Sequence, residues 1–143
     1  SSAASDVYKR QDSDMNSPQI PISWGELFDK ITILQIKLEN LTSKDALENV
    51  EREFKQLRSI YIKYFPESTE AKQFEEELKQ INQQLWDIED KIRKKERNRS
   101  FDDEFIQLAR SVYIINDERS RIKRKINDVF GSEFLEEKSY TEY

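Results

Sequence analysis

The stretch that decides the fold is "WGELFDKITILQIKLENL", residues 24–41. Its centre, "ITILQIKL", alternates β-branched apolar residues and by itself resembles a buried strand. Its flanks indicate a helix instead, because Ser23 followed three residues later by Glu26 is the capping-box pattern of a helix start. From Leu27 to Leu41 apolar residues then recur at alternating spacings of four and three. We therefore predict a helix over residues 24–41.

The same spacing recurs in three further segments. A second helix is predicted to begin near Ser43 and to end before Pro66, because the residue before a proline disfavours helical backbone. A third begins near Ser68 and ends at an "NRS" turn. Ser100 is predicted to cap the fourth helix, which ends at Gly131, a typical residue after a helix C-terminus. About four amphipathic helices with a repeat of seven predict an all-α antiparallel bundle, built on a long coiled-coil-like hairpin.

Charges along the predicted hairpin of the last two helices support an antiparallel register. Matching the two apolar seams pairs Leu85 with Val112 and Leu78 with Arg119. In this register the basic runs 93–97 and 121–125 lie beside the acidic runs 102–104 and 75–77, respectively. Each basic cluster is therefore expected to be neutralised within the chain rather than to form a nucleic-acid patch.

Composition limits the chemistry that the chain can perform. The 143 residues include 24 Lys or Arg and 29 Asp or Glu, which gives a net charge of −5. A charge this mild and mixed does not indicate a nucleic-acid partner. The sequence has no Cys and no His, which excludes a thiol nucleophile, a Ser-His-Asp triad and an ordinary zinc site. We expect no cofactor.

The chain has the length of one domain, but its start differs from the rest. Residues 1–11 are rich in Ser and Ala, and the only Met is Met15. We expect residues 1–14 to be a disordered non-native leader, and residues 15–143 to form a single helical-bundle domain with a short C-terminal tail. No stretch contains the roughly 18 to 20 apolar residues of a membrane span. Without Cys or an apolar signal sequence, a cytoplasmic location is the default expectation.

Carboxylate pairs at helical spacing raise the possibility of a magnesium site. The pairs are Glu26 with Asp29 and Glu48 with Glu51. On a helical wheel Asp29 lies opposite the apolar seam and Glu48 points well away from its own seam, whereas a metal site needs carboxylates directed into the bundle. We predict solvated helix faces at these positions and no metal.

The predicted first helix is apolar on two sides, because Ile33 and Ile36 point away from the seam that begins at Leu27. A helix that is apolar all round normally has partners all round. Two elements of the same chain or a second chain would both satisfy this pattern. We predict that Ile33 and Ile36 lie at a subunit interface, with a two-fold symmetric dimer as the leading expectation.

Arg119 is the one charged residue on the seam of the predicted fourth helix. Burying a guanidinium without a partner costs several kcal/mol, so a carboxylate or an amide must reach it. In a structural interpretation, Glu75 or an amide pairs with Arg119 and fixes the register of the hairpin. In a functional interpretation, Arg119 and its neighbours present donors to an anionic ligand. The candidate ligand-binding residues are Trp86, Glu89, Arg93, Asn116 and Arg119.

Four stretches together resemble a family of short, all-helical bacterial and phage proteins of unknown function. They are "ISWGELFDKITILQIK", "LWDIEDKIRKKE", "FIQLARSVYIINDERSRIKRKIN" and "GSEFLEEKSY", and the resemblance covers about residues 22–140. Genes of this family often lie beside those of glycosyltransferases and other surface-polysaccharide proteins. The resemblance implies a stand-alone helical protein and no particular catalytic residue.

Two functions from different classes remain open. The favoured one is a non-enzymatic interaction module that is oligomeric, binds a protein partner and serves surface-polysaccharide assembly. The alternative is a small enzyme or binding protein for a phosphorylated ligand, such as a nucleotide sugar, that uses buried Arg and carboxylate groups.

Overall fold

Four helices make up the fold of this computed structural model, which describes residues 17–132 and 141–143. They are α2 (Trp24–Asn40), α3 (Lys44–Tyr64), α4 (Thr69–Arg97) and α5 (Asp103–Phe130), and the described residues contain no strand. The predicted all-α class is therefore confirmed. The leader predicted over residues 1–14 lies outside the described residues.

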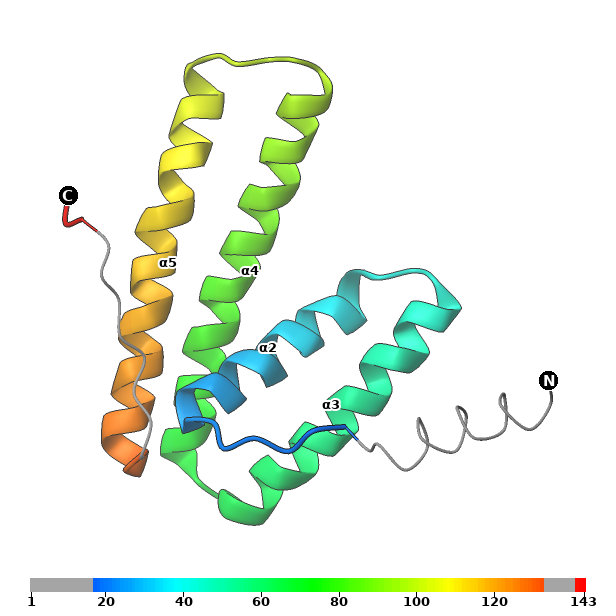
Figure 1. The fold of residues 1–143 in the computed structure, drawn as a ribbon, viewed down its shortest axis with the longest axis vertical. Helices are drawn as coiled ribbons and strands as arrows, with labels where there is room; N and C mark the ends of the chain where they lie inside the picture. Colours follow the sequence, from blue (N-terminus) through cyan, green and yellow to red (C-terminus); the bar gives the residue numbers. More distant parts are fainter. Residues whose placement is uncertain (1–16, 133–140) are drawn as a thin grey trace, which may run out of the picture.

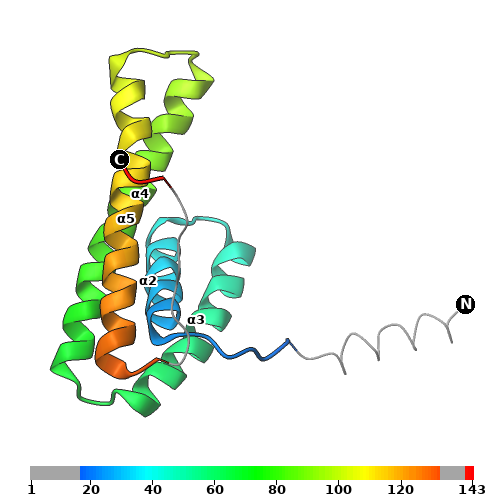
Figure 2. The ribbon, with the colours of Figure 1, turned by 60° about the vertical axis from the view of Figure 1, so that its left-hand side comes forward.

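Two helical hairpins are stacked against each other (Figure 1). Helices α4 and α5 run antiparallel and side by side, and the shorter pair α2 and α3 lies across their lower half. Helix α2 contacts α3, α4 and α5 and is thus the central element. Figure 2 shows that the upper half of the α4–α5 hairpin extends beyond α2 and α3.

Serine side chains begin the first three helices, as the sequence predicts. The Oγ atoms of Ser23 and Ser68 accept hydrogen bonds from backbone N–H groups three residues later, at 3.1 and 3.0 Å. Ser43 caps α3 in the same way at 3.4 Å. These bonds satisfy N–H groups that have no acceptor within the helix. The starts of α2, α3 and α4 are thus determined locally.

Helix α5 begins at a different residue from the one that the sequence predicts, and it ends where predicted. The N-cap is Asp102 and not Ser100, because the Asp102 Oδ1 accepts from the Phe105 N–H at 3.0 Å. The chain turns before this point through Arg99, which has a positive φ of 50°. Gly131 ends α5 in the left-handed conformation at φ 70°, as expected of a glycine at this position.

The apolar core lies where α2 crosses the base of the α4–α5 hairpin. Phe28 is fully buried, and its ring lies 5.2 Å from that of Tyr61, 5.5 Å from that of Phe65 and 5.9 Å from that of Phe130. The remaining buried members of this cluster come from α2, α4 and α5; they are Leu27, Ile31, Ala71, Phe74, Leu78 and Ile126. The base of the molecule therefore has a core of its own.

Burial within the chain contradicts the subunit interface predicted at Ile36, which is only 1% exposed. Ile33 is half-buried beside α4, where it lines a hollow. Because α2 contacts three helices of its own chain, Ile36 has intramolecular partners on the side of α2 that lies away from the Leu27 seam.

The upper half of the α4–α5 hairpin has no such core. We call residues 83–114 the arm. No residue between 83 and 122 is buried, although this segment continues the apolar seams of both helices. The buried residues of α4 lie between Ala71 and Asn82, and those of α5 lie between Lys123 and Asn127. The arm is thus a two-helix projection whose seam is only partly shielded from solvent.

Candidate functional site

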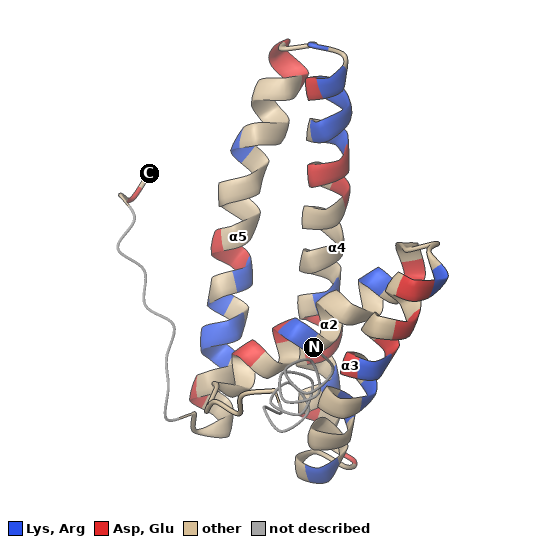
Figure 3. Ribbon diagram, turned by 45° about the vertical axis from the view of Figure 1, so that its right-hand side comes forward, with Lys and Arg blue, Asp and Glu red and all other residues tan. Residues whose placement is uncertain are grey.

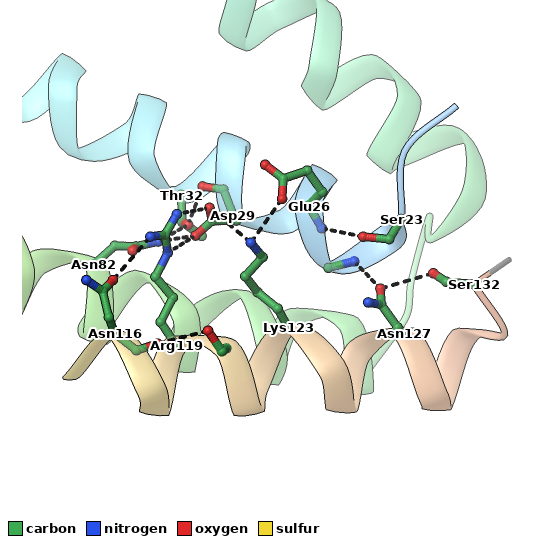
Figure 4. A network of polar contacts seen from close by, with 12 residues as sticks. Ser23, Glu26, Asp29, Thr32, Asn82, Asn116, Arg119, Lys123, Asn127 and Ser132 are labelled. Atoms are coloured by element: carbon green, nitrogen blue, oxygen red, sulfur yellow. Dashed lines mark hydrogen bonds and ion pairs between the residues drawn. The ribbon is translucent and has the colours of Figure 1, made fainter. Parts of the chain in front are cut away.

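A cluster of charged side chains joins α2 to α5 at the centre of the molecule (Figure 4). Asp29 on α2 is 2% exposed. The Arg119 guanidinium on α5 donates from Nε to Asp29 Oδ1 at 2.8 Å and from Nη2 to Asp29 Oδ2. This two-point pairing matches the fork of a guanidinium to both carboxylate oxygens. A carboxylate therefore reaches Arg119, as its position required.

Helix α4 contributes an amide to the same cluster. Asn82 Nδ2 donates to Asp29 Oδ1 at 2.9 Å and to Thr32 Oγ1 at 3.0 Å. The Thr32 hydroxyl donates to the backbone carbonyl of Asp29 at 2.9 Å. The Asp29 side chain thus receives donors from two helices and links α2, α4 and α5 through one buried group.

A second cation lies in the same cluster. Lys123 on α5 is 5% exposed, and its Nζ lies 2.9 Å from Glu26 Oε2 and 4.0 Å from Asp29 Oδ2. Each of the two cations therefore lies beside a carboxylate of α2. Such an arrangement stabilises one packing of the helices, because removal of any one member leaves a poorly solvated charge.

The prediction that Asp29 lies on a solvated face was wrong. The errors for Asp29 and for Ile36 have the same cause, because other helices of the chain cover the sides of α2 that lie away from its apolar seam. Asp29 was expected on a solvated face because it lies opposite the apolar seam of α2. That side of α2 is covered by α5, and Arg119 makes the burial of a carboxylate possible. Glu48 and Glu51, in contrast, are exposed, as predicted. Among the residues that the structure describes, no group of three or more metal-ligating side chains lies together.

The start of α2 approaches α5 more closely than a side chain would permit. Gly25 N–H donates to Asn127 Oδ1 at 2.8 Å. A Cβ atom on Gly25 would lie 2.5 Å from the backbone carbonyl oxygen of Lys123, which is closer than atoms can pack. Ser132 Oγ also donates to Asn127 Oδ1, at 3.1 Å, and accepts from the Trp24 N–H at 2.9 Å. A glycine directly after a helix cap is the signal in the sequence that could have revealed this contact.

A separate polar cluster surrounds Glu75 on α4. Its Oε1 accepts from Gln35 Nε2 at 2.9 Å and from Arg58 Nη1 at 2.6 Å. Burial, together with the negative charge of Glu75, raises the pKa of Tyr61 to about 12. The sequence predicts that Glu75 or an amide pairs with Arg119; Glu75 does not, whereas the Asn116 amide oxygen accepts from Arg119 at 3.3 Å. Glu75 points toward α2 and α3, so it joins the two hairpins instead of fixing the register of one.

The acidic and basic runs at the other end of the hairpin meet as predicted. Lys95 Nζ lies 2.8 Å from Asp102 Oδ2 and 2.9 Å from Glu104 Oε2. These contacts span the turn between α4 and α5. The register that the seams indicate is thus supported at the tip of the arm.

The structure brings most of the candidate ligand-binding residues together. Trp86, Glu89, Arg93 and Arg119 line one hollow of about 440 Å³ at the base of the arm, which Ile33, Asn82, Leu85 and Asp90 also line. Asn116 lies next to it, and its Oδ1 accepts from Arg119 Nη1 at 3.3 Å. The two cations of the hollow each face a carboxylate, since Arg93 lies 3.7 Å from Glu89 and Arg119 binds Asp29. The hollow therefore carries no surplus positive charge.

Comparison with known protein families assigns the chain to one of them. A family model described as "Family of unknown function (DUF6165)" matches residues 18–143. The chain belongs to this family. No curated protein and no solved structure matched the chain. In the described part of the chain, none of the helices has the length and apolar character that crossing a membrane requires.

Proposed function

We propose that this DUF6165 chain is a non-enzymatic helical interaction module that binds a protein partner through its arm. The observation that carries the proposal is the absence of any buried residue between 83 and 122, in a segment with continuous apolar seams. A helical hairpin of this kind normally buries its seam against further helices. The base of the molecule does so with α2, whereas the arm has no counterpart among the described residues.

The arm also exposes apolar side chains outside its seam. The large ones are Phe101, Ile106, Tyr113 and Ile114, and Ile106 is 50% exposed. All four belong to α5 or to the turn before it. Removing apolar surface from water is favourable by about 25 cal/mol per Å², and part of this gain is offset by the entropy lost on association. A partner helix laid along the arm would cover both the seam and these side chains.

The alternative of a phosphorylated ligand has less support from the geometry. Its candidate residues do line one hollow, but Arg119 and Arg93 already face carboxylates. An anionic ligand would have to displace Asp29, which is buried and also held by Asn82. Displacing a buried carboxylate from a guanidinium is costly. The apolar arm is therefore the better supported binding surface.

The family resemblance suggests which proteins to test as partners. If genes of this family stand beside surface-polysaccharide genes, then a glycosyltransferase or another enzyme of surface-polysaccharide assembly is the partner class to examine first. The chain would then position or regulate that enzyme by helix-to-helix contact, without chemistry of its own.

The proposal is tested by photo-crosslinking in the native host. A photoreactive amino acid at Ile106 is expected to capture one defined protein, whereas the same group at Lys55 on α3, whose side chain is 73% exposed, is not. A variant that lacks residues 86–92 and 105–111 shortens both helices by one heptad and keeps the seams aligned. This variant is expected to lose the partner. Equal capture from Ile106 and Lys55 would overturn the proposal. Because the short-arm variant lacks Ile106, its binding is measured by co-purification of the captured protein, and unchanged co-purification would also overturn the proposal.

A further inference from the structure

We infer that the arm of a second copy of this chain occupies the open face of the arm, in an antiparallel pair whose two-fold axis passes beside Ile106. The inference rests on the proposed function and takes a second copy of the chain, in place of an enzyme, as the protein that covers the arm. It also moves the expected dimer contact away from α2, whose apolar sides are covered within one chain.

The open face continues a face that is already used for helix packing. Ile106, Ala109, Tyr113 and Asn116 recur at spacings of three and four, and the same series leads to Lys123 and Asn127. Lys123 and Asn127 contact Glu26 and Gly25 of α2. One stripe of α5 is therefore covered by a helix at the base and uncovered along the arm, beyond the point where α2 turns away (Figure 2).

The arm stripe accepts an aromatic ring from the chain itself. The ring of Tyr143, at the C-terminal end, lies 5.2 Å from that of Tyr113. A hydrogen bond to Asp117 raises the pKa of the Tyr143 hydroxyl. The contact is at the lower end of the arm, and Ile106 stays 50% exposed. The stripe thus binds apolar groups where they are available, and its upper part remains open.

The charges of the arm favour a second copy in the antiparallel direction. Residues 93–99, at the end of α4 and in the turn after it, include five basic residues and one acidic residue, whereas Asp87, Glu89 and Asp90 precede them on α4. Figure 3 shows this change along α4, with basic segments at the tip and an acidic segment farther down. Glu89 and Asp90 also lie beside Arg93 and Lys94 of the same helix, at 3.7 and 3.1 Å, so the complementarity is between the net charges of the segments and not between unpaired groups. An antiparallel partner places its net basic tip beside the net acidic segment, while a parallel partner would place like net charges together.

The same alignment gives α5 complementary contacts. When the axis passes beside Ile106, residues whose numbers sum to about 212 lie opposite each other in two antiparallel α5 helices. Arg110 is the one basic residue of α5 within the arm, and it then faces the partner copy's Asp102 and Asp103. Ile106 faces its own copy. Apolar contact at the axis with opposite charges on either side is the pattern of a two-fold symmetric interface.

The size of the arm sets the expected affinity. Between residues 83 and 97, α4 rises about 22 Å, and two adjacent helices are roughly 20 Å wide. Each copy therefore offers a face of about 450 Å², and the pair buries roughly 900 Å². This area is below the roughly 1,200 Å² at which stable specific interfaces begin and is typical of transient ones. We therefore expect a weak, reversible dimer, and we take a Kd on the order of 10 µM for the design of the test.

The absence of Cys from the sequence gives a direct test with the full chain. Ile106→Cys introduces a single thiol beside the proposed axis. Gln107→Cys is the matched control, because it lies at the same level of α5, is also exposed and is turned about 100° away. Under mild oxidation at about 50 µM chain, well above the expected Kd, Ile106→Cys is expected to form a disulfide-linked dimer at least tenfold faster than Gln107→Cys.

Sedimentation equilibrium of the unmodified chain provides the second measurement. We expect a monomer–dimer equilibrium that Ile106→Asp shifts to monomer, with an unchanged far-UV circular dichroism spectrum because Ile106 is half exposed. A chain that stays monomeric at about 1 mM, a hundred times the expected Kd, or equal oxidation rates of the two Cys variants, would overturn the second copy as occupant. If the chain is monomeric while Ile106 still captures another protein in the host, the proposed function stands without the dimer. If neither contact is found, both fail.

Discussion

Replacing Asp29 by Asn tests whether the buried charge cluster holds α2 in place. The substitution keeps the shape of the side chain and removes its charge. Arg119 and Lys123 then lose the negative charge of Asp29, and Lys123 keeps its contact with Glu26. Breaking a buried ion pair by removing one partner typically costs about 3–5 kcal/mol. We expect Asp29→Asn to lower the free energy of unfolding by that amount.

Urea unfolding followed by circular dichroism at 222 nm measures this loss. The matched control is Glu39→Gln, which removes the carboxylate of an exposed pair with Lys79 that also joins α2 to α4. Exposed pairs contribute about 0–1 kcal/mol, so the control should change stability little. A loss of 3–5 kcal/mol would also lower the melting temperature by roughly 10 °C in a chain of this length.

The double variant Asp29→Asn with Arg119→Met separates charge from packing. Because both charges of the pair are then absent, it should be more stable than Asp29→Asn alone. With the single variant Arg119→Met measured as well, the cycle gives the coupling energy between the two side chains. If Asp29→Asn destabilised the chain no more than Glu39→Gln, the claim that the charge cluster anchors α2 would be refuted.

Three further predictions follow from the fold. Gly25→Ala should lower the free energy of unfolding, measured with urea, by more than about 2 kcal/mol, because its Cβ would lie 2.5 Å from a backbone oxygen of α5. Gly131→Ala is the control. A Cβ would have open space there, so we expect a loss of only about 1 kcal/mol, which comes from the positive φ. Tyr61 keeps its proton in the fold to a pKa of about 12, from an ordinary value of 10.0. Because the pKa is higher in the fold than in the unfolded chain, Tyr61 contributes fully to the free energy of unfolding below pH 10, and up to about 2–3 kcal/mol is lost as the pH rises to 12. Tyr61→Phe should flatten this part of the plot of unfolding free energy against pH. An unchanged plot would contradict the raised pKa. Ile36→Lys should unfold the chain, since it places a charge in a fully enclosed site. Ile114→Lys on the arm should remain folded. A folded monomer of Ile36→Lys, seen by circular dichroism and light scattering, would contradict the burial of Ile36.

Local features of the fold were predictable from the sequence. The starts of α2, α3 and α4 depend on a serine and the next three residues, and Gly131 ends α5 through its own backbone conformation. Such features depend only on residues within one helical turn of each other, so they can be predicted from the local sequence. The one misplaced cap has the same origin, because Ser100 and Asp102 both lie before α5 and both are good caps.

The candidate site was predictable only in part. Arg119 was identified because a charge interrupts an apolar seam, and the need for a carboxylate followed from the cost of burying it. The hollow formed by Trp86, Glu89 and Arg93 followed from helical spacing along α4 and the pairing of α4 with α5. Neither argument could say which carboxylate reaches the guanidinium.

Only the tertiary structure decided what surrounds α2. Asp29 and Arg119 are 90 residues apart in the chain, and they meet because α2 crosses the hairpin with Gly25 against the α5 backbone. That crossing buries Ile36 and Asp29 on sides of α2 that a single apolar seam leaves outside. A helical wheel gives the direction of a side chain but not the helix that it will face. Periodicity is a property of one helix, whereas burial and ion pairing depend on where the others lie.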